Sequence, residues 1–258
     1  PRGAHPLEHV RPAEYSEFCR WQQVSGNLVR IVTLAPEVPN AIEVIRQIAQ
    51  SGVTVSLGHT AASPAEITAA IDAGATMGTH LGNGCAGLVP RHNNVFWPQL
   101  ADDRLTCSLI ADGWHVPATM LHCIVRCKSL DRLVLTSDVS GFGGCGVGRY
   151  RSGGVEVDVL EDGRIVVAGQ TQFLAGAGVT TGDCVAQFMS LCNVPLYAAW
   201  KLASTQPAAI INSRSPFLRE GSAASLTVFR ITGTDKSENS AQRPRFEQVA
   251  TVVDGSLV

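Results

Sequence analysis

The sequence predicts an α/β protein in which parallel strands and helices alternate as in a (β/α) barrel. Two observations favour this class: apolar runs alternate with amphipathic stretches from residue 28 to residue 140, and most of the apolar runs end in polar residues. Such alternation is typical of parallel strands joined by crossover helices. The length of 258 residues suits one barrel, or one to two ordinary domains.

Five apolar runs are expected to form the parallel strands. They lie in residues 28–34, 54–59, 75–83, 105–116 and 132–140. The expected helix over residues 41–52 places Ile42, Ile45 and Ile48 on one face and stops at Gly52.

The helix after the second strand has clear end signals. Ser63 is the expected N-cap, Pro64 takes the first helical position, Glu66 closes a capping box and Gly74 ends the helix. A further helix is expected around residues 118–130, before the fifth strand.

The pattern changes after residue 140. The glycine-rich segment 141–148 is interpreted as a flexible lid or connection rather than a dinucleotide loop, because no suitable helix follows it. The later elements are a hairpin, two helices and two strands, expected at residues 155–169, 183–191, 196–204, 225–230 and 249–258. We therefore divide the chain into a barrel portion, 1–212, and strands of a small β appendage, 213–258.

Composition excludes some partners. A net charge of −2 without a long basic run argues against nucleic acid, because phosphate binding needs clustered Lys and Arg. No apolar run reaches eighteen residues, so we expect no membrane segment. Eight scattered cysteines without a C-x-x-C pair indicate mostly buried thiols in a reducing compartment, the cytoplasm. Cys123 and Cys127 could meet a metal, but no partner pair is near them in sequence.

Polar residues follow four of the expected strands where each strand ends. They are His59, His80 with Asn83, Asp112 with His115, and Asp138. In parallel barrels the carboxyl ends of the strands converge on one mouth, so a shared site is the economical explanation. The alternatives for single residues are a structural histidine and an aspartate that caps the next helix.

These residue types suit metal-assisted hydrolysis. Imidazoles bind divalent ions such as Zn²⁺, which is the expected metal, with Fe²⁺ or another divalent ion as alternatives. A carboxylate at a neighbouring strand end could then act as the base toward the attacking water, and Asp138 is the candidate.

Several segments taken together resemble the N-acetylglucosamine-6-phosphate deacetylase family. They are "GAHP", "VSLGHTAASPAEITAAIDAGATMGTHLGNG", "RLTCSLIADGWHV", "LVLTSDVS" and "VVDG", which together span nearly the whole chain. The resemblance implies a metal-dependent amidohydrolase with a (β/α)8 barrel and a small β-sandwich. It also implies a homodimer that acts on a small amino-sugar phosphate.

The resemblance assigns roles position by position. It makes His59 and His80 metal ligands, Asp138 the general base and acid, and His5 the group that polarises the acetamide carbonyl. The positions that match substrate contacts are Ala4, His5, Asn83, Gly84, Arg91, Asp112, Gly113, Trp114, His115, Leu174, Ala175 and Gly176. Among these, Arg91 and His115 suit a phosphate group.

Simpler interpretations of these positions stay open. Arg91 could be a solvated loop charge, His5 a loosely held terminal residue, and Asn83 a turn residue. The segment 174–176 could be a loop packed on the rim.

The sequence also departs from the family pattern. The family's third ligand is a glutamate that should lie upstream of Pro1, and Glu8 and Glu14 are weak substitutes. About three barrel units are likewise expected upstream. Gly82 and Gly84 replace a bulky residue and an alanine, and residues 176–178 lack a common serine, which loosens the identity of the sugar.

Two other functions compete with deacetylation. One is a different metal-dependent amidohydrolase, such as a cyclic amidase or a deaminase. The other is a metal-free barrel remnant that acts as a binding protein, which the absence of the glutamate favours.

Overall fold

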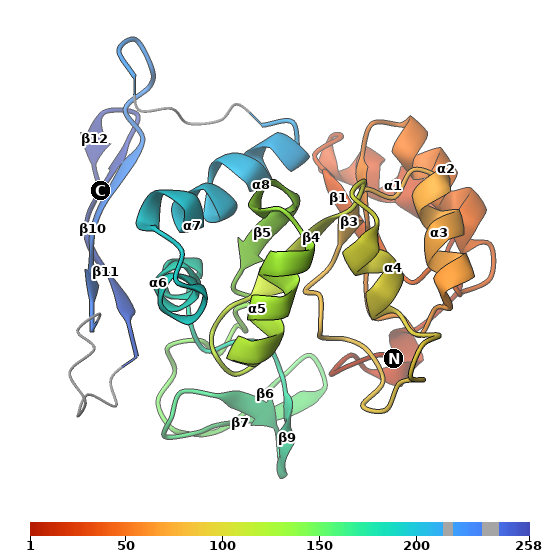
Figure 1. Cartoon of the computed structure of the whole chain (residues 1–258), viewed down its shortest axis with the longest axis horizontal. Coiled ribbons are helices and arrows are strands. Elements are labelled where there is room, and N and C mark those ends of the chain that lie inside the picture. The colour runs from red at the N-terminus through yellow and green to blue at the C-terminus, as the bar shows by residue number, and fades with distance from the viewer. Residues whose placement is uncertain (214–218, 234–242) are drawn as a thin grey trace.

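The computed structural model describes residues 1–213, 219–233 and 243–258, and its centre is a parallel sheet (Figure 1). Five strands pair in the order β1-β2-β3-β4-β5. They are β1 (Ile31–Leu34), β2 (Thr54–Leu57), β3 (Met77–Gly78), β4 (Thr106–Ile110) and β5 (Leu133–Thr136). All five predicted strands are confirmed, and the α/β class with them.

One helix precedes β1, and the other four lie between consecutive strands of the sheet. They are α1 (Tyr15–Ser25), α2 (Ala41–Gln50), α3 (Pro64–Asp72), α4 (Phe96–Ala101) and α5 (Ala118–Cys127). The helix α2 buries Ile45 and Ile48 in one hydrophobic cluster with β2 and α3. The predicted capping box of α3 is present, because Ser63 Oγ accepts from Glu66 N–H and the Glu66 carboxylate accepts from Ser63 N–H.

A second sheet follows β5. It contains β6 (Gly148–Ser152), β7 (Val155–Val159), β8 (Ile165–Val167) and β9 (Gln170–Leu174), all antiparallel. The hairpin of β7 and β8 was predicted from its turn residues. The sequence did not predict β6 and β9, because neither contains a continuous apolar run and both are defined by pairing.

The remaining helices and strands complete the chain. The predicted helices correspond to α6 (Thr181–Cys192) and α7 (Leu196–Ala203), and α8 (Thr205–Ile210) follows them. A third sheet holds β10 (Leu226–Thr232), β11 (Arg245–Val253) and β12 (Ser256–Leu257). Figure 1 shows this sheet at one side of the molecule, next to α6 and α7. Its Phe229 stacks on Trp200 of α7 with ring centroids 4.6 Å apart.

Two further expectations meet the structure here. Within the described ranges, no helix combines the length and apolar character needed to cross a membrane. All eight cysteines are free thiols, but only Cys107 and Cys184 are buried and four are exposed. The expectation that most cysteines are buried is therefore wrong, since α5 turns Cys123 and Cys127 toward solvent.

Candidate functional site

Three predicted site residues share an unusual backbone conformation. His59 follows β2 with a φ of 51°, His80 follows β3 with a φ of 30°, and Asp138 follows β5 with a φ of 54°. Positive φ is uncommon for residues with a side chain, and it persists where surrounding contacts hold it. Each strand therefore ends in a sharp change of direction at the residue that carries the functional group.

The imidazoles of His59 and His80 meet at the carboxyl ends of their strands. Their Nε2 atoms lie 3.1 Å apart, and their ring centroids lie 4.8 Å apart. Two nitrogen ligands of one tetrahedral zinc ion lie roughly 3.3–3.4 Å apart, so this spacing is close to that of a ligand pair. The Nδ1 atoms of both rings are buried and lack a hydrogen-bond partner among the described residues. The spacing of the two Nε2 atoms therefore fits a divalent metal.

Both imidazoles are poised to stay neutral. Burial, with the neighbouring imidazoles of His80 and His5, lowers the pKa of His59 to about 4. Burial also lowers the pKa of His80, although the Asp138 carboxylate opposes this shift. Metal ligation requires the neutral imidazole, so these shifts favour it near neutral pH.

This burial has a consequence for stability. In the metal-free protein, the free energy of unfolding is expected to fall by about 1–2 kcal/mol between about pH 7 and about pH 5. Unfolded His59 takes up a proton near pH 6.5, whereas folded His59 stays neutral down to about pH 4. Urea unfolding at the two pH values measures the difference. In His59→Asn, most of this fall in the free energy of unfolding should disappear. In His92→Asn, which changes an exposed histidine, the fall should remain. An equal fall in both variants would contradict the assignment of the pH dependence to His59.

The histidine pair is not yet a complete ligand set. Across the ranges that the structure describes, no three His, Cys, Asp or Glu side chains converge on one metal position. Neither Glu8, in a short 3-10 helix, nor Glu14, before α1, therefore supplies the third ligand there.

Asp138 lies near the pair and beside a predicted substrate segment. The charge of Asp138 acts on His80 and opposes the lowering of the His80 pKa. The carbonyl of Asp138 accepts a hydrogen bond of 2.8 Å from Ala177 N–H, and Val139 pairs with Ala177 as a parallel bridge. The backbone contact brings the segment 174–176 next to Asp138.

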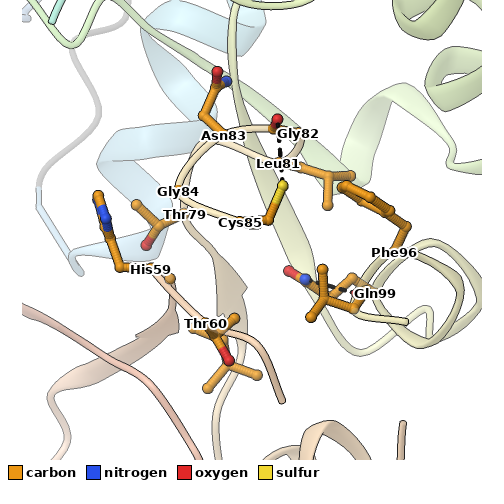
Figure 2. Close-up of a pocket in the computed structure, with 13 residues that line it drawn as sticks. His59, Thr60, Thr79, Leu81, Gly82, Asn83, Gly84, Cys85, Phe96 and Gln99 are labelled. Atoms are coloured by element: carbon orange, nitrogen blue, oxygen red, sulfur yellow. Dashed lines mark hydrogen bonds between the residues drawn. The ribbon is translucent and has the colours of Figure 1, made fainter. Parts of the chain in front are cut away.

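Glycine and short side chains surround the pair. A Cβ at Gly84 would lie 3.0 Å from His80 Cε1 and 3.1 Å from His59 Nδ1. Figure 2 shows the loop that carries Asn83 and Gly84 beside His59. Asn83 N–H donates to the carbonyl of His80, as in a turn.

His5 is exposed, but its ring lies 4.8 Å from the ring of His59. Ala4 precedes it and is half-buried.

A second cluster follows β4. The Asp112 carboxylate accepts hydrogen bonds from the backbone N–H groups of Trp114 and His115, and it lies 2.7 Å from His115 Nδ1. Burial alone would raise the pKa of Asp112, but its hydrogen bonds to His115 and Trp114 outweigh burial and lower that pKa. His115 also acts electrostatically on His80 and helps to lower the His80 pKa.

Two arginines that sequence reasoning missed fix this second cluster. Arg243 lies over the Trp114 ring at 3.7 Å and donates to the carbonyl of Asp112 at 3.0 Å. Arg164 lies 4.8 Å from the same ring. A Cβ on Gly113 would approach Arg243 to 3.0 Å. These contacts join segments far apart in sequence, so local sequence patterns do not predict them.

Arg91 belongs to an exposed loop before α4. Its carbonyl accepts a hydrogen bond of 3.3 Å from the indole of Trp97, and its own side chain is exposed. The phosphate contact that the resemblance implies for the Arg91 guanidinium therefore stays a prediction.

Similarity to known proteins was found by sequence and by structure, whereas no protein-family model matches the chain. N-acetylgalactosamine-6-phosphate deacetylase of Escherichia coli O157:H7 is 37% identical over 211 residues, which are 81% of this chain and 55% of the relative. N-acetylglucosamine-6-phosphate deacetylase of Homo sapiens is 35% identical over 220 residues, which are 81% and 52%.

A solved structure matches at the level of the fold. It is the D267A mutant of N-acetyl-D-glucosamine-6-phosphate deacetylase from Mycobacterium smegmatis, in complex with N-acetyl-D-glucosamine-6-phosphate. Its TM-score is 0.86 and its identity 30%, and the match covers 99% of this chain and 64% of that chain. The chain thus spans about half the length of the curated relatives it matches.

Proposed function

Because this chain is a homologue of the N-acetylglucosamine-6-phosphate deacetylases, in the amidohydrolase superfamily, we propose that the protein hydrolyses the acetamide of N-acetylglucosamine 6-phosphate. The products are acetate and glucosamine 6-phosphate. The observation that carries the proposal is the pair of imidazoles, His80 buried and His59 half-buried, whose Nε2 atoms lie 3.1 Å apart.

His59 and His80 would hold the divalent metal, with Zn²⁺ as the first choice. A bound metal acidifies water and polarises a carbonyl. The Nε2 atoms of these two imidazoles, 3.1 Å apart, would be the donors to that ion.

Asp138 is proposed as the general base and then the general acid. Its carboxylate takes a proton from the attacking water and later gives a proton to the departing amine. His5, whose ring lies against His59, donates a hydrogen bond to the acetamide oxygen as negative charge develops there. The backbone contact between Asp138 and Ala177 supports a role for the segment 174–176 close to the reacting group.

The remaining predicted residues are proposed to bind the sugar phosphate. Gly84 and Asn83 lie beside the histidines and would contact the sugar with Ala4. Arg91 and His115 would bind the phosphate, while Asp112 orients His115. Gly113 and Trp114, which precede His115 in the chain, would contact the same substrate.

The five-stranded sheet is proposed to form part of a (β/α)8 barrel, and β10 to β12 part of a small β-sandwich. The division at residues 1–212 and 213–258, a homodimer and a cytoplasmic location stay predictions.

A substrate panel tests the proposal. Release of acetate is measured with N-acetylglucosamine 6-phosphate, N-acetylgalactosamine 6-phosphate, unphosphorylated N-acetylglucosamine and a cyclic amide. We expect metal-dependent turnover of the first substrate. Faster turnover of N-acetylgalactosamine 6-phosphate would make that sugar the proposed substrate. Turnover of the cyclic amide alone would favour another amidohydrolase. No turnover with any metal would favour a binding protein.

Arg91→Ala is expected to raise KM for the phosphorylated sugar about tenfold or more, because a hydrogen bond to a charged group contributes about 1.5–3 kcal/mol. Since Arg91 is exposed, its loss should leave the melting temperature unchanged. Arg126→Ala, an exposed arginine on α5, is the matched control. An unchanged KM in Arg91→Ala would return this residue to a solvated loop charge.

A further inference from the structure

Glu37 lies in the connection between β1 and α2, yet its carboxylate reaches the segment that follows His59. Glu37 Oε2 accepts a hydrogen bond of 2.5 Å from Thr60 Oγ1. Glu37 Oε1 accepts one of 2.7 Å from the backbone N–H of Ala61. One carboxylate therefore ties the ends of two neighbouring strands together, β1 through its own connection and β2 through the His59 segment.

The hydrogen bonds continue through Thr60. Its hydroxyl donates to Glu37 and accepts from the N–H of Ala62 at 2.9 Å, and Thr60 is buried. Hydrogen bonds to a carboxylate are roughly twice as strong as those between neutral groups. Glu37 thus accepts from the Thr60 hydroxyl and the Ala61 N–H, and through the Thr60 hydroxyl it also supports the Ala62 N–H.

Within the part of the chain that the structure describes, no backbone–backbone hydrogen bond holds residues 59–62. The ladder between β1 and β2 ends where Gly58 N–H donates to the carbonyl of Leu34, and the cap of α3 begins at Ser63. His59 lies between these two anchors with its φ of 51°, a conformation that needs external support. The hydrogen bonds from Thr60 and Ala61 to Glu37 supply it.

We infer that Glu37 is a positioning residue for His59: it fixes the backbone that aims this imidazole at His80. The inference rests on the proposed metal site. Because both Glu37 oxygens are already engaged, Glu37 acts on the ligand rather than as a ligand. His80 has a comparable support, since its N–H donates to the buried Ser108 Oγ at 2.6 Å.

Metal affinity is the direct test. Zn²⁺ affinity of the full chain is measured by competition with a fluorescent chelator in wild type, Glu37→Gln and Thr60→Val. Loss of an outer partner of a metal ligand typically weakens binding about 10–100-fold, and we expect at least about tenfold for Glu37→Gln. Hydrogen exchange of the Ala61 amide should become faster in the same variant.

Asp183→Asn is the matched control. Asp183 also accepts from a threonine hydroxyl and from backbone N–H groups, but it does so at the start of α6. It should leave Zn²⁺ affinity unchanged even where stability falls.

The outcomes separate the two proposals. Wild-type Zn²⁺ affinity in both Glu37→Gln and Thr60→Val, or an equal loss in Asp183→Asn, overturns the role of Glu37 and leaves the metal pair intact. Two results overturn both the proposed His59–His80 metal site and the role of Glu37. One is a wild-type chain that binds no Zn²⁺, and the other is a His80→Asn variant with the same Zn²⁺ affinity as wild type.

Discussion

Asp138→Asn is expected to lower kcat by about 10²–10⁴-fold, the usual contribution of a positioned general acid–base group. The amide keeps the shape of the carboxylate but neither takes a proton from water nor returns one to the amine. Asparagine tolerates positive φ, so the backbone at 54° should be kept. Steady-state release of acetate gives kcat, and thermal unfolding with Zn²⁺ titration checks that fold and metal binding are unchanged.

The chain offers a control with the same local geometry. Asp254 has a φ of 48° in the turn between β11 and β12, away from the histidine pair. Asp254→Asn should behave as wild type in every measurement. Near-wild-type kcat in Asp138→Asn would rule out Asp138 as the base, and an equal loss in both variants would indicate a general effect on folding.

The parallel sheet could be predicted because its signal is local. Buried strands produce continuous apolar runs such as the Leu-Val-Leu that begins β5, and helix ends carry their own signals, as Ser63 and Glu66 do. The strands β6 and β9 have no comparable signal, since β9 is largely exposed and neither strand has a continuous apolar run. Their existence depends on pairing between segments, which local sequence does not encode.

The site could be predicted in part for a related reason. Parallel strands bring their carboxyl ends to one edge, so residues that end successive strands are neighbours in space wherever the sheet forms. This places His59 near His80, but the spacing of their nitrogens depends on left-handed backbone at both residues. The contacts of Glu37 with Thr60 and of Arg243 with Trp114 join different segments. Because they are not local, the sequence pattern does not predict them.

His80→Asn is expected to weaken Zn²⁺ binding by about 10³-fold or more, because losing an outer partner of a ligand already costs about 10–100-fold. His80 is buried and presents the Nε2 atom that faces His59, so the shorter asparagine cannot reach the same position. Asparagine again tolerates the positive φ, which keeps the backbone comparable. Chelator competition measures affinity, and acetate release at stoichiometric metal should fall below detection.

His92→Asn provides the control, because His92 is exposed in the loop before α4. If both variants bind Zn²⁺ as tightly as wild type, the histidine pair is structural and the metal lies elsewhere. If His80→Asn alone loses metal, its activity should return at high metal concentration only as far as binding returns. That proportionality would distinguish loss of the metal from loss of the acid–base chemistry assigned to Asp138, because the defect in Asp138→Asn should persist with the metal fully bound.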